Sequence, residues 1–557
     1  MHRVLTCVVF VVLVGSAAAS WAKEYPDRWV YVSRSLRADQ DVTDIQRIVQ
    51  TASEHGINGM VLSAGLDRLD LQPREYLERL EKVRQICEKA HVEIVPSVFS
   101  VGYGSSVLAY NRNLAAGIPV VEVPFVVKDG QAILDSDRTP VIANGGFEQR
   151  EGNRVEGYRL QDRPGEISFA DSEVVRSGHA SLRLENFGLD KYGHGRIMQE
   201  VEVQPHRCYR LSCWVKTASL EPRDAFRILV LGMDGRDVAP YDPRIPATTD
   251  WRQVVMGFNS LDYSKVRIYA GVWNGKAGRV WIDDMAIEEV ALLNVLRRPG
   301  TPLTVQSEDT GEQYEEGRDF GPVRDRTLTF RFDHEPPRLV VTPGSRIKDG
   351  DRLKVSYYHG MGVNAGQVSV CMSEPEVYQI WEKQAGLMHK YLSPSKYLLS
   401  MDEIRAGGSC QACKQRRLSM AQILGDCITK QVSLLRQADP KAEMFCWSDM
   451  LDPNHNAHAG YYLVDGDFTG SWNYVPRDLV IVCWYYEKRK ESLAFFSSRS
   501  FRTLAGAYYD GDTLENPRGW LEGLDNTSNA VGIMYTTWQD KYTLLGPFGD
   551  LVRDRSK

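Results

Sequence analysis

Residues 29–63 read WVYVSRSLRADQDVTDIQRIVQTASEHGINGMVLS, and they decide the fold class. Apolar runs at the two ends of this stretch, 29–33 and 58–63, are typical of buried strands. From about 43 to 55, apolar residues recur every three or four positions, as on one face of a helix. The same order continues with a helix-like and a strand-like stretch, at 74–89 and 92–99. Strands that alternate with helices predict a parallel sheet or barrel.

The alternation stops after residue 99 and resumes far along the chain. A helix is predicted from about 374 to 391, and five strand-like stretches follow it, at 396–401, 443–447, 479–484, 503–509 and 532–538. Three strands before the interruption and five after it make eight. We therefore predict an α/β fold, a (β/α)8 TIM barrel interrupted after its third strand.

The interruption itself is rich in β-structure. Residues 138–290 contain short alternating strands separated by Gly, Asp and Pro turns, which predicts an inserted β-sandwich of the jelly-roll type. A smaller β-rich connecting segment follows at 291–360. The two parts of the barrel are then predicted at 23–137 and 361–557, and this division accounts for a chain of 557 residues, which is long for one domain.

The beginning of the sequence and its charge indicate the compartment and exclude some partners. Residues 1–22 carry one positive charge, an apolar run and a stretch of small residues, the pattern of a secretory signal peptide. We expect an exported protein, periplasmic or extracellular, without a membrane span. The formal net charge of −6 provides no basic field for a polyanion, so nucleic acid is not an expected partner. The oligomeric state is not predicted.

Ten cysteines are present, and one of them lies in the predicted signal peptide, which leaves an odd number in the exported chain. Cys410 and Cys413 form the one CxxC pair, which fits a disulfide, half of a zinc site or two free thiols. Asp452, His455 and His458 have a spacing that could seat a metal, although a solvated loop explains them more simply.

Two adjacent acids, Asp402 and Glu403, follow the predicted fourth strand. Catalytic residues of TIM barrels gather at the carboxyl ends of the strands. A carboxyl pair whose surroundings separate the two pKa values can divide an acid role from an orienting role, as cleavage of a glycosidic bond requires. The simpler alternative is that one of these acids pairs with Arg405 or caps the next helix.

Aromatic residues also follow the later strands. They can form the apolar wall on which a sugar ring stacks, while neighbouring acids and hydroxyls bind its polar groups. The residues concerned are Trp447, Trp484, Tyr508, Asp510, Trp538 and Asp540.

On these residues the sequence resembles glycoside hydrolase family 20, the retaining β-N-acetylhexosaminidases, over about 23–137 and 361–557. The resemblance implies that Asp402 orients the acetamido group of the substrate and that Glu403 is the general acid/base. The acetamido oxygen of the substrate itself would then attack the anomeric carbon. The resemblance also implies sugar contacts from Arg34, Tyr508, Asp510, Trp538 and Asp540, with Trp447 and Trp484 as pocket walls.

The inserted sandwich resembles carbohydrate-binding modules of the galactose-binding-like type. The resemblance rests on phrases such as 144–148 (NGGFE) and 281–284 (WIDD), which match opening and closing strands of those modules. It implies glycan binding and a structural Ca²⁺ held by Glu148 and Asp284, since such modules often carry one and oxygen ligands suit it. No cofactor is expected for catalysis.

Three hypotheses about function remain open at this stage. The first is an exported glycoside hydrolase that cleaves a β-linked sugar of the N-acetylhexosamine type with retention. The second is a retaining glycosidase of a non-acetamido sugar, with Glu403 as acid/base and Asp510 as nucleophile. The third is a non-catalytic glycan-binding protein built on a barrel scaffold.

Overall fold

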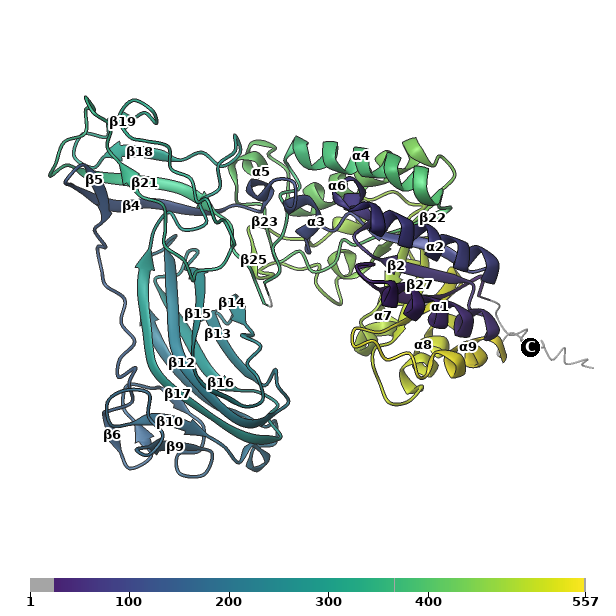
Figure 1. The fold of residues 1–557 in the computed structure, drawn as a ribbon, viewed down its shortest axis with the longest axis horizontal. Coiled ribbons are helices and arrows are strands. Elements are labelled where there is room, and N and C mark those ends of the chain that lie inside the picture. The colour runs from purple at the N-terminus through teal and green to yellow at the C-terminus, as the bar shows by residue number, and fades with distance from the viewer. Residues whose placement is uncertain (1–24, 365, 555–557) are drawn as a thin grey trace, which may run out of the picture.

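The structure is a computed structural model that describes residues 25–364 and 366–554. Figure 1 shows a barrel of strands and helices built from the purple and the green-to-yellow parts of the chain, with the inserted β-structure beside it. The predicted signal peptide, residues 1–22, lies outside the described residues. Within the described ranges, no helix has both the length and the apolar character that crossing a membrane requires.

Eight parallel strands close into a barrel, in the order β1-β2-β3-β22-β24-β26-β27-β28. The predicted eight-stranded barrel, interrupted after its third strand, is therefore confirmed. The strands are β1 (Asp27–Ser33), β2 (Gly59–Ser63), β3 (Glu93–Val98), β22 (Lys396–Leu399), β24 (Glu443–Trp447), β26 (Val480–Cys483), β27 (Arg502–Tyr508) and β28 (Ala530–Thr536).

The interior of the barrel is a packed core to which every strand contributes at least one buried apolar side chain. The indole of Trp29 lies across it and meets the ring of Phe445 with 4.6 Å between ring centroids. Gly59 makes room for this indole, because a Cβ atom on Gly59 would lie 2.4 Å from Trp29 Cδ1. Because side chains fill the interior, the space for a ligand lies at the mouth of the barrel.

Helices surround the barrel and bury their apolar faces against it. In α1 (Asp39–Glu54), for example, Ile45, Val49 and Ala52 are buried at the three- and four-residue spacing that the sequence predicts. The other main helices are α2 (Arg74–Ala90), α4 (Pro375–Leu392), α6 (Met420–Ala438), α7 (Arg489–Ser497), α8 (Glu515–Asp525) and α9 (Leu545–Asp554).

The insertion contains the predicted β-sandwich, made of two antiparallel five-stranded sheets. Leu211 and Val215 of one sheet and Ile228 and Ile268 of the other belong to one buried apolar cluster, so the two sheets share a core. The first sheet has the order β15 (Thr249–Asn259), β12 (Cys208–Glu221), β17 (Ala277–Val290), β10 (Ser181–Leu184) and β9 (Ser168–Asp171). The second has the order β14 (Asp237–Tyr241), β13 (Phe226–Gly232), β16 (Lys265–Val272), β11 (Gly195–Glu202) and β8 (Leu160–Gln161).

A further six-stranded sheet contains strands from before and from after the sandwich in the sequence. Because of this sheet, the first part of the barrel ends earlier than the predicted residue 137. The stretch 118–134, which the sequence analysis assigns to the barrel, forms two strands of this sheet, and the first of them pairs with a strand more than 220 residues later. Local patterning does not reveal so distant a partner. The order is β19 (Gln313–Tyr314), β18 (Thr304–Ser307), β21 (Arg352–His359), β4 (Ile118–Lys128), β5 (Gln131–Leu134) and β20 (Leu339–Val340).

Candidate active site

A cavity of about 880 Å³ opens at the carboxyl ends of the barrel strands. Each of the eight strands contributes to its lining at its end or just beyond it. The volume lies in the range of about 300–1,000 Å³ that is typical of small-molecule sites. Its position is the one where enzymes of this fold hold their catalytic residues.

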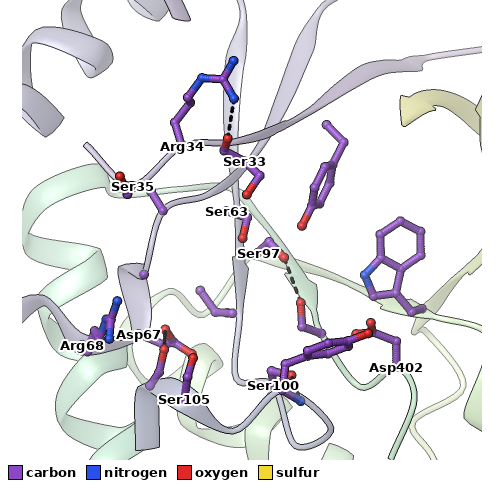
Figure 2. A pocket seen from close by; sticks show the side chains of 18 of the residues that line it. Ser33, Arg34, Ser35, Ser63, Asp67, Arg68, Ser97, Ser100, Ser105 and Asp402 are labelled. Atoms are coloured by element: carbon purple, nitrogen blue, oxygen red, sulfur yellow. Dashed lines mark hydrogen bonds between the residues drawn. The ribbon is translucent and has the colours of Figure 1, made fainter. Parts of the chain in front are cut away.

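Serine side chains form one half of the cavity wall. Ser33, Ser63, Ser97 and Ser400 lie at or just after the ends of four neighbouring strands, β1, β2, β3 and β22. The hydroxyl oxygens of Ser97 and Ser400 are 2.9 Å apart, and Figure 2 shows Ser33, Ser63 and Ser97 along the same side of the cavity. Hydroxyls both donate and accept hydrogen bonds, so this half can bind a polyhydroxylated ligand. The sequence analysis missed it, although a serine at each successive strand end was a visible signal.

Aromatic rings form the other half. Trp447, Trp484, Tyr509 and Trp538 line the cavity from β24, β26, β27 and β28. The rings of Trp484 and Tyr509 lie 6.3 Å apart with their planes 8° from parallel. Tyr509 and Trp538 keep about half of their surface exposed, 49% and 51%. Exposed aromatic faces in a cavity suit the apolar face of a sugar ring, and the three predicted tryptophans are among them.

Asp402 lies just beyond β22, lines the cavity and is labelled in Figure 2. Desolvation raises the pKa of its carboxyl group to about 8, and the negative charges of Asp449 and Glu403 add to the effect. Asp402 therefore keeps its proton at neutral pH, which is the state that a general acid needs.

Asp449 is a third, fully buried carboxyl group beside this pair, two residues after β24. Its Oδ2 atom accepts hydrogen bonds from the backbone N–H of Glu403 and from Asn456 Nδ2, both at 2.9 Å. Trp484 Nε1 lies 3.4 Å from the other oxygen. Burial raises the pKa of Asp449 to about 6. This residue, which the sequence analysis did not single out as a site residue, holds the backbone of Glu403 in place.

Glu403 also lines the cavity, and two neighbours hold its carboxylate. Arg405 Nη2 lies 2.9 Å from Glu403 Oε1, and the Tyr103 hydroxyl donates a hydrogen bond to Oε2. The ion pair with Arg405, expected as the simpler alternative to a catalytic role, is therefore present, and it lies at the cavity. These two contacts fix the position of both carboxyl oxygens of Glu403 at the edge of the cavity.

The backbone around the two acids is tightly supported. Glu403 has a φ of 49°, in the left-handed region that non-glycine residues rarely adopt. Gln367 donates hydrogen bonds from Nε2 to the carbonyl oxygens of Glu403 and Gly102, at 2.7 and 3.0 Å. A Cβ atom on Gly102 would lie 2.1 Å from the carbonyl oxygen of Asp402, so the loop after β3 can approach the acids only with glycine there. Such an outlier at a cavity indicates a functional constraint.

Arginines give the serine half a positive charge. Arg34, predicted from the sequence, lines the cavity, and its Nη1 atom forms an ion pair with Asp540 Oδ1 at 2.5 Å. Asp540 is mostly exposed and is not among the lining residues, so it contributes through Arg34. Arg37 and Arg68 also line the cavity, and within the described chain no hydrogen bond or ion pair engages either guanidinium group.

Asp67 lies beside Arg68 in the segment after β2 and was also missed by the sequence analysis. It is buried and accepts hydrogen bonds from Ser106 Oγ at 2.5 Å and from the backbone N–H of Phe99 at 3.3 Å. Burial raises the pKa of its carboxyl group. Figure 2 places Asp67 and Arg68 on the other side of the view from Asp402.

Besides Asp540, two more predicted contact residues, Tyr508 and Asp510, lie outside the cavity lining. Tyr508 is buried and stacks on Tyr535 with ring centroids 4.1 Å apart. Asp510 accepts hydrogen bonds from the backbone N–H of Trp538 at 2.9 Å and from the Thr537 hydroxyl, so it holds the loop that carries the tryptophan. The reason is a turn at the end of β27: Tyr508 has a φ of 83° and the next two residues also have positive φ, which brings Tyr509 to the cavity instead.

The predicted calcium ligands lie in the sandwich, away from the barrel cavity. Glu148 Oε1 accepts a hydrogen bond from the backbone N–H of His179 at 2.8 Å, and Asp284 Oδ1 accepts one from Ser177 Oγ at 2.7 Å. Both acids therefore bind the same short turn, 177–180. The calcium site stays a prediction.

The sequence analysis left a metal open as one possibility at two other places, the loop with His455 and the pair Cys410 and Cys413. His455 packs between the rings of Trp484 and Tyr485, and in the described part of the chain Asp452, His455 and His458 do not bring three ligand atoms together. Cys410 and Cys413 have their sulfur atoms 3.6 Å apart, too far for a disulfide bond.

Comparisons with known proteins find distant similarity only. No family model and no curated protein matches the sequence. A rhamnosidase from Novosphingobium sp. PP1Y is 10% identical, with 97% of this chain and 59% of that chain covered and a TM-score of 0.33. TmCBM61, solved with beta-1,4-galactotriose, is 16% identical over 28% of this chain and 100% of its own, with a TM-score of 0.22. A CBM4 structure is 18% identical over 27% of this chain and 100% of its own, with a TM-score of 0.21. Similarity this low does not indicate the function of this chain.

Proposed function

We propose that the protein is a glycoside hydrolase whose active site is the cavity at the mouth of the barrel. One observation carries the proposal: Asp402, whose pKa burial raises, and the adjacent Glu403, which Arg405 contacts, lie in a cavity that has hydroxyls on one side and aromatic rings on the other. A carboxylic acid can protonate the leaving oxygen of a glycosidic bond, and a carboxylate can serve the anomeric carbon. The cavity walls supply contacts for a sugar ring.

In this proposal Asp402 is the general acid and Glu403 is the anionic partner. Burial keeps the proton on Asp402, whereas Arg405 and Tyr103 each bind one carboxyl oxygen of Glu403 and so fix the orientation of its side chain. Asp449 is a positioning residue that binds the backbone of Glu403. These roles are the reverse of those that the resemblance to family 20 implies. The reason is that burial raises the pKa of Asp402, whereas Glu403 is in contact with Arg405.

The position of β27 bears on the mechanism. Tyr508 and Asp510 were expected to contact the sugar, or Asp510 to act as a nucleophile, but neither lines the cavity. This removes support from the substrate-assisted cleavage of an N-acetylhexosamine and from the Asp510 alternative. We propose instead that Glu403 faces the anomeric carbon, as nucleophile or as base toward water.

The arginines support a sugar that carries an acidic substituent. Arg68 and Arg37 line the cavity without a partner among the described residues, and a guanidinium group binds carboxylate and sulfate oxygens well. Loss of a hydrogen bond to a charged group weakens binding by about 1.5–3 kcal/mol. Arg68→Ala should therefore raise KM at least about tenfold for a uronic or sulfated glycoside, and change KM for a neutral glycoside little.

The test is turnover of a panel of aryl glycosides and soluble polysaccharides that includes uronic, sulfated, neutral and N-acetylhexosaminide substrates. We expect release of aryl groups or new reducing ends from at least one of them. Asp402→Asn and Glu403→Gln should each lower kcat at least about 100-fold. Asp512→Asn is the matched control, because Asp512 is 95% exposed and does not line the cavity. Equal rates in the wild type and both cavity variants would refute the assigned roles.

A non-catalytic glycan-binding protein is the second candidate, and the ion pair between Glu403 and Arg405 favours it, since an engaged carboxylate is less free to react. The same panel separates the two functions. Binding of a glycan by the wild type, lost in Trp484→Ala and unaccompanied by any product, would establish the binding protein.

A further inference from the structure

Three buried cysteines meet on the side of the barrel where the chain returns from the insertion. The sulfur atoms of Cys371 and Cys410 are 3.4 Å apart, those of Cys410 and Cys413 are 3.6 Å apart, and those of Cys371 and Cys413 are 3.8 Å apart. All three side chains are buried. Among the described residues this is the one group of three or more cysteine, histidine or acidic side chains whose ligand atoms converge.

The distances match a metal–thiolate site and not a disulfide. A disulfide bond joins sulfur atoms at about 2.05 Å, which is far shorter than any of the three distances. A zinc–thiolate bond measures about 2.3 Å, so two thiolates on a tetrahedral zinc ion lie about 3.8 Å apart. The three sulfur atoms form a triangle with edges close to that value. We propose that Cys371, Cys410 and Cys413 bind one structural zinc ion.

The surroundings suit three thiolates around a divalent cation. Such a site carries a net negative charge, and the buried guanidinium group of Arg298 lies beside it, with Nη2 at 3.7 Å from Cys410 Sγ. No fourth cysteine, histidine or acidic ligand atom joins the group in the described part of the chain. The buried hydroxyl of Ser373 lies next to Cys413, so it is placed to hold a water molecule as the fourth ligand.

The position of the cluster indicates what the ion does. Cys371 precedes α4, where the chain rejoins the barrel, and Cys410 and Cys413 lie at the start of α5 (Gln411–Gln415), in the loop that also carries Glu403. Arg298, from the inserted part of the chain, donates a hydrogen bond to the carbonyl oxygen of Ala115 at 2.9 Å. The ion would therefore fasten the loop of the acids to the segment that leads back from the insertion. Binding releases protons from the thiols and requires no oxidant.

The experiment measures metal in the full chain, purified without chelator. We expect about one zinc ion per chain by elemental mass spectrometry, and loss of that ion in Cys371→Ser. Cys87→Ser is the matched control, because Cys87 is buried in α2 outside the cluster, and it should keep the ion. A chelator should lower the melting temperature of the wild type and of Cys87→Ser, but not that of Cys371→Ser.

A second measurement avoids reliance on a variant that fails to fold. Replacement of zinc by Co²⁺ in the wild type should produce the thiolate-to-cobalt absorption and the visible bands of a tetrahedral site. Zinc content that is equal in Cys371→Ser and the wild type would overturn the proposal, and so would a wild-type mass two hydrogens lower that locates a disulfide within the cluster. The inference does not depend on the proposed glycosidase activity.

Discussion

Replacement of Asp402 by asparagine tests whether the cavity holds a carboxyl group in its protonated form. Asparagine has nearly the same shape and stays neutral at every pH. In the folded protein the pKa of Asp402 is raised from 3.8 to about 8, mainly because the group is desolvated. In the unfolded chain the carboxyl group ionises freely. Between pH 3.8 and about pH 8 the unfolded state therefore binds fewer protons than the folded state.

The sign of the pH dependence follows from this difference. Stability from Asp402 is fully present below about pH 4 and is lost as the pH rises toward 8, by about 1.4 kcal/mol per pH unit and about 5 kcal/mol in all. Because the side chain is partly exposed in the cavity, we expect about 2–4 kcal/mol. Asp402→Asn should match the wild type at pH 4 and exceed its free energy of unfolding by that amount at pH 8.

The assay is equilibrium unfolding in urea at pH 4, 6 and 8, followed by tryptophan fluorescence. Asp512→Asn serves as the control and should track the wild type at all three values, because its carboxyl group is 95% exposed. The reasoning would be refuted if Asp402→Asn were no more stable than the wild type at pH 8, since Asp402 would then be ionised in the folded protein.

Three further predictions concern the site and the barrel core. Activity should fall above about pH 8, where Asp402 loses its proton, and below about pH 6, where Asp449 gains one. Asp449→Asn should remove the lower limb of the pH–rate profile and move the upper limb to lower pH, because the charge of Asp449 helps to raise the pKa of Asp402. Trp484→Ala should raise KM about tenfold, because it removes one stacking face from the cavity. Gly59→Ala should destabilise the fold by about 1–3 kcal/mol in a urea titration, because the added methyl group meets a buried indole, whereas Gly386→Ala, in an open position of α4, should not destabilise it.

The barrel could be predicted because its signal is local. Each strand shows its own apolar pattern, with a helix-like stretch after the first and the second, and the count of eight follows from adding the strands. The sheet that contains β4 and β21 could not be predicted in this way, since the whole sandwich lies between these two strands in the sequence. The same limit applies to the cysteines: Cys410 and Cys413 are visible as a pair, but Cys371 joins them only through the return of the chain to the barrel.

Cavity-lining residues were predicted where strand ends are well defined and missed where the backbone departs from strand geometry. Asp402, Glu403 and the tryptophans line the cavity, as their place after the strands indicated. Because Tyr508 has a positive φ, Tyr509 lines the cavity in place of Tyr508. No residue propensity predicts such a turn at a pair of tyrosines. Arg68 follows β2 in an irregular helical turn, where a sequence alone does not say which side chains face inward.

The most direct test of the central claim is hydrolysis in ¹⁸O-labelled water, with products analysed by mass spectrometry. The account predicts that the wild type forms a product with one ¹⁸O atom at its new reducing end, and that Asp402→Asn and Glu403→Gln form little of it while Asp512→Asn forms as much as the wild type. Products without the label, or equal labelled product from all four proteins, would contradict the claim that these two acids hydrolyse a glycosidic bond in the barrel cavity.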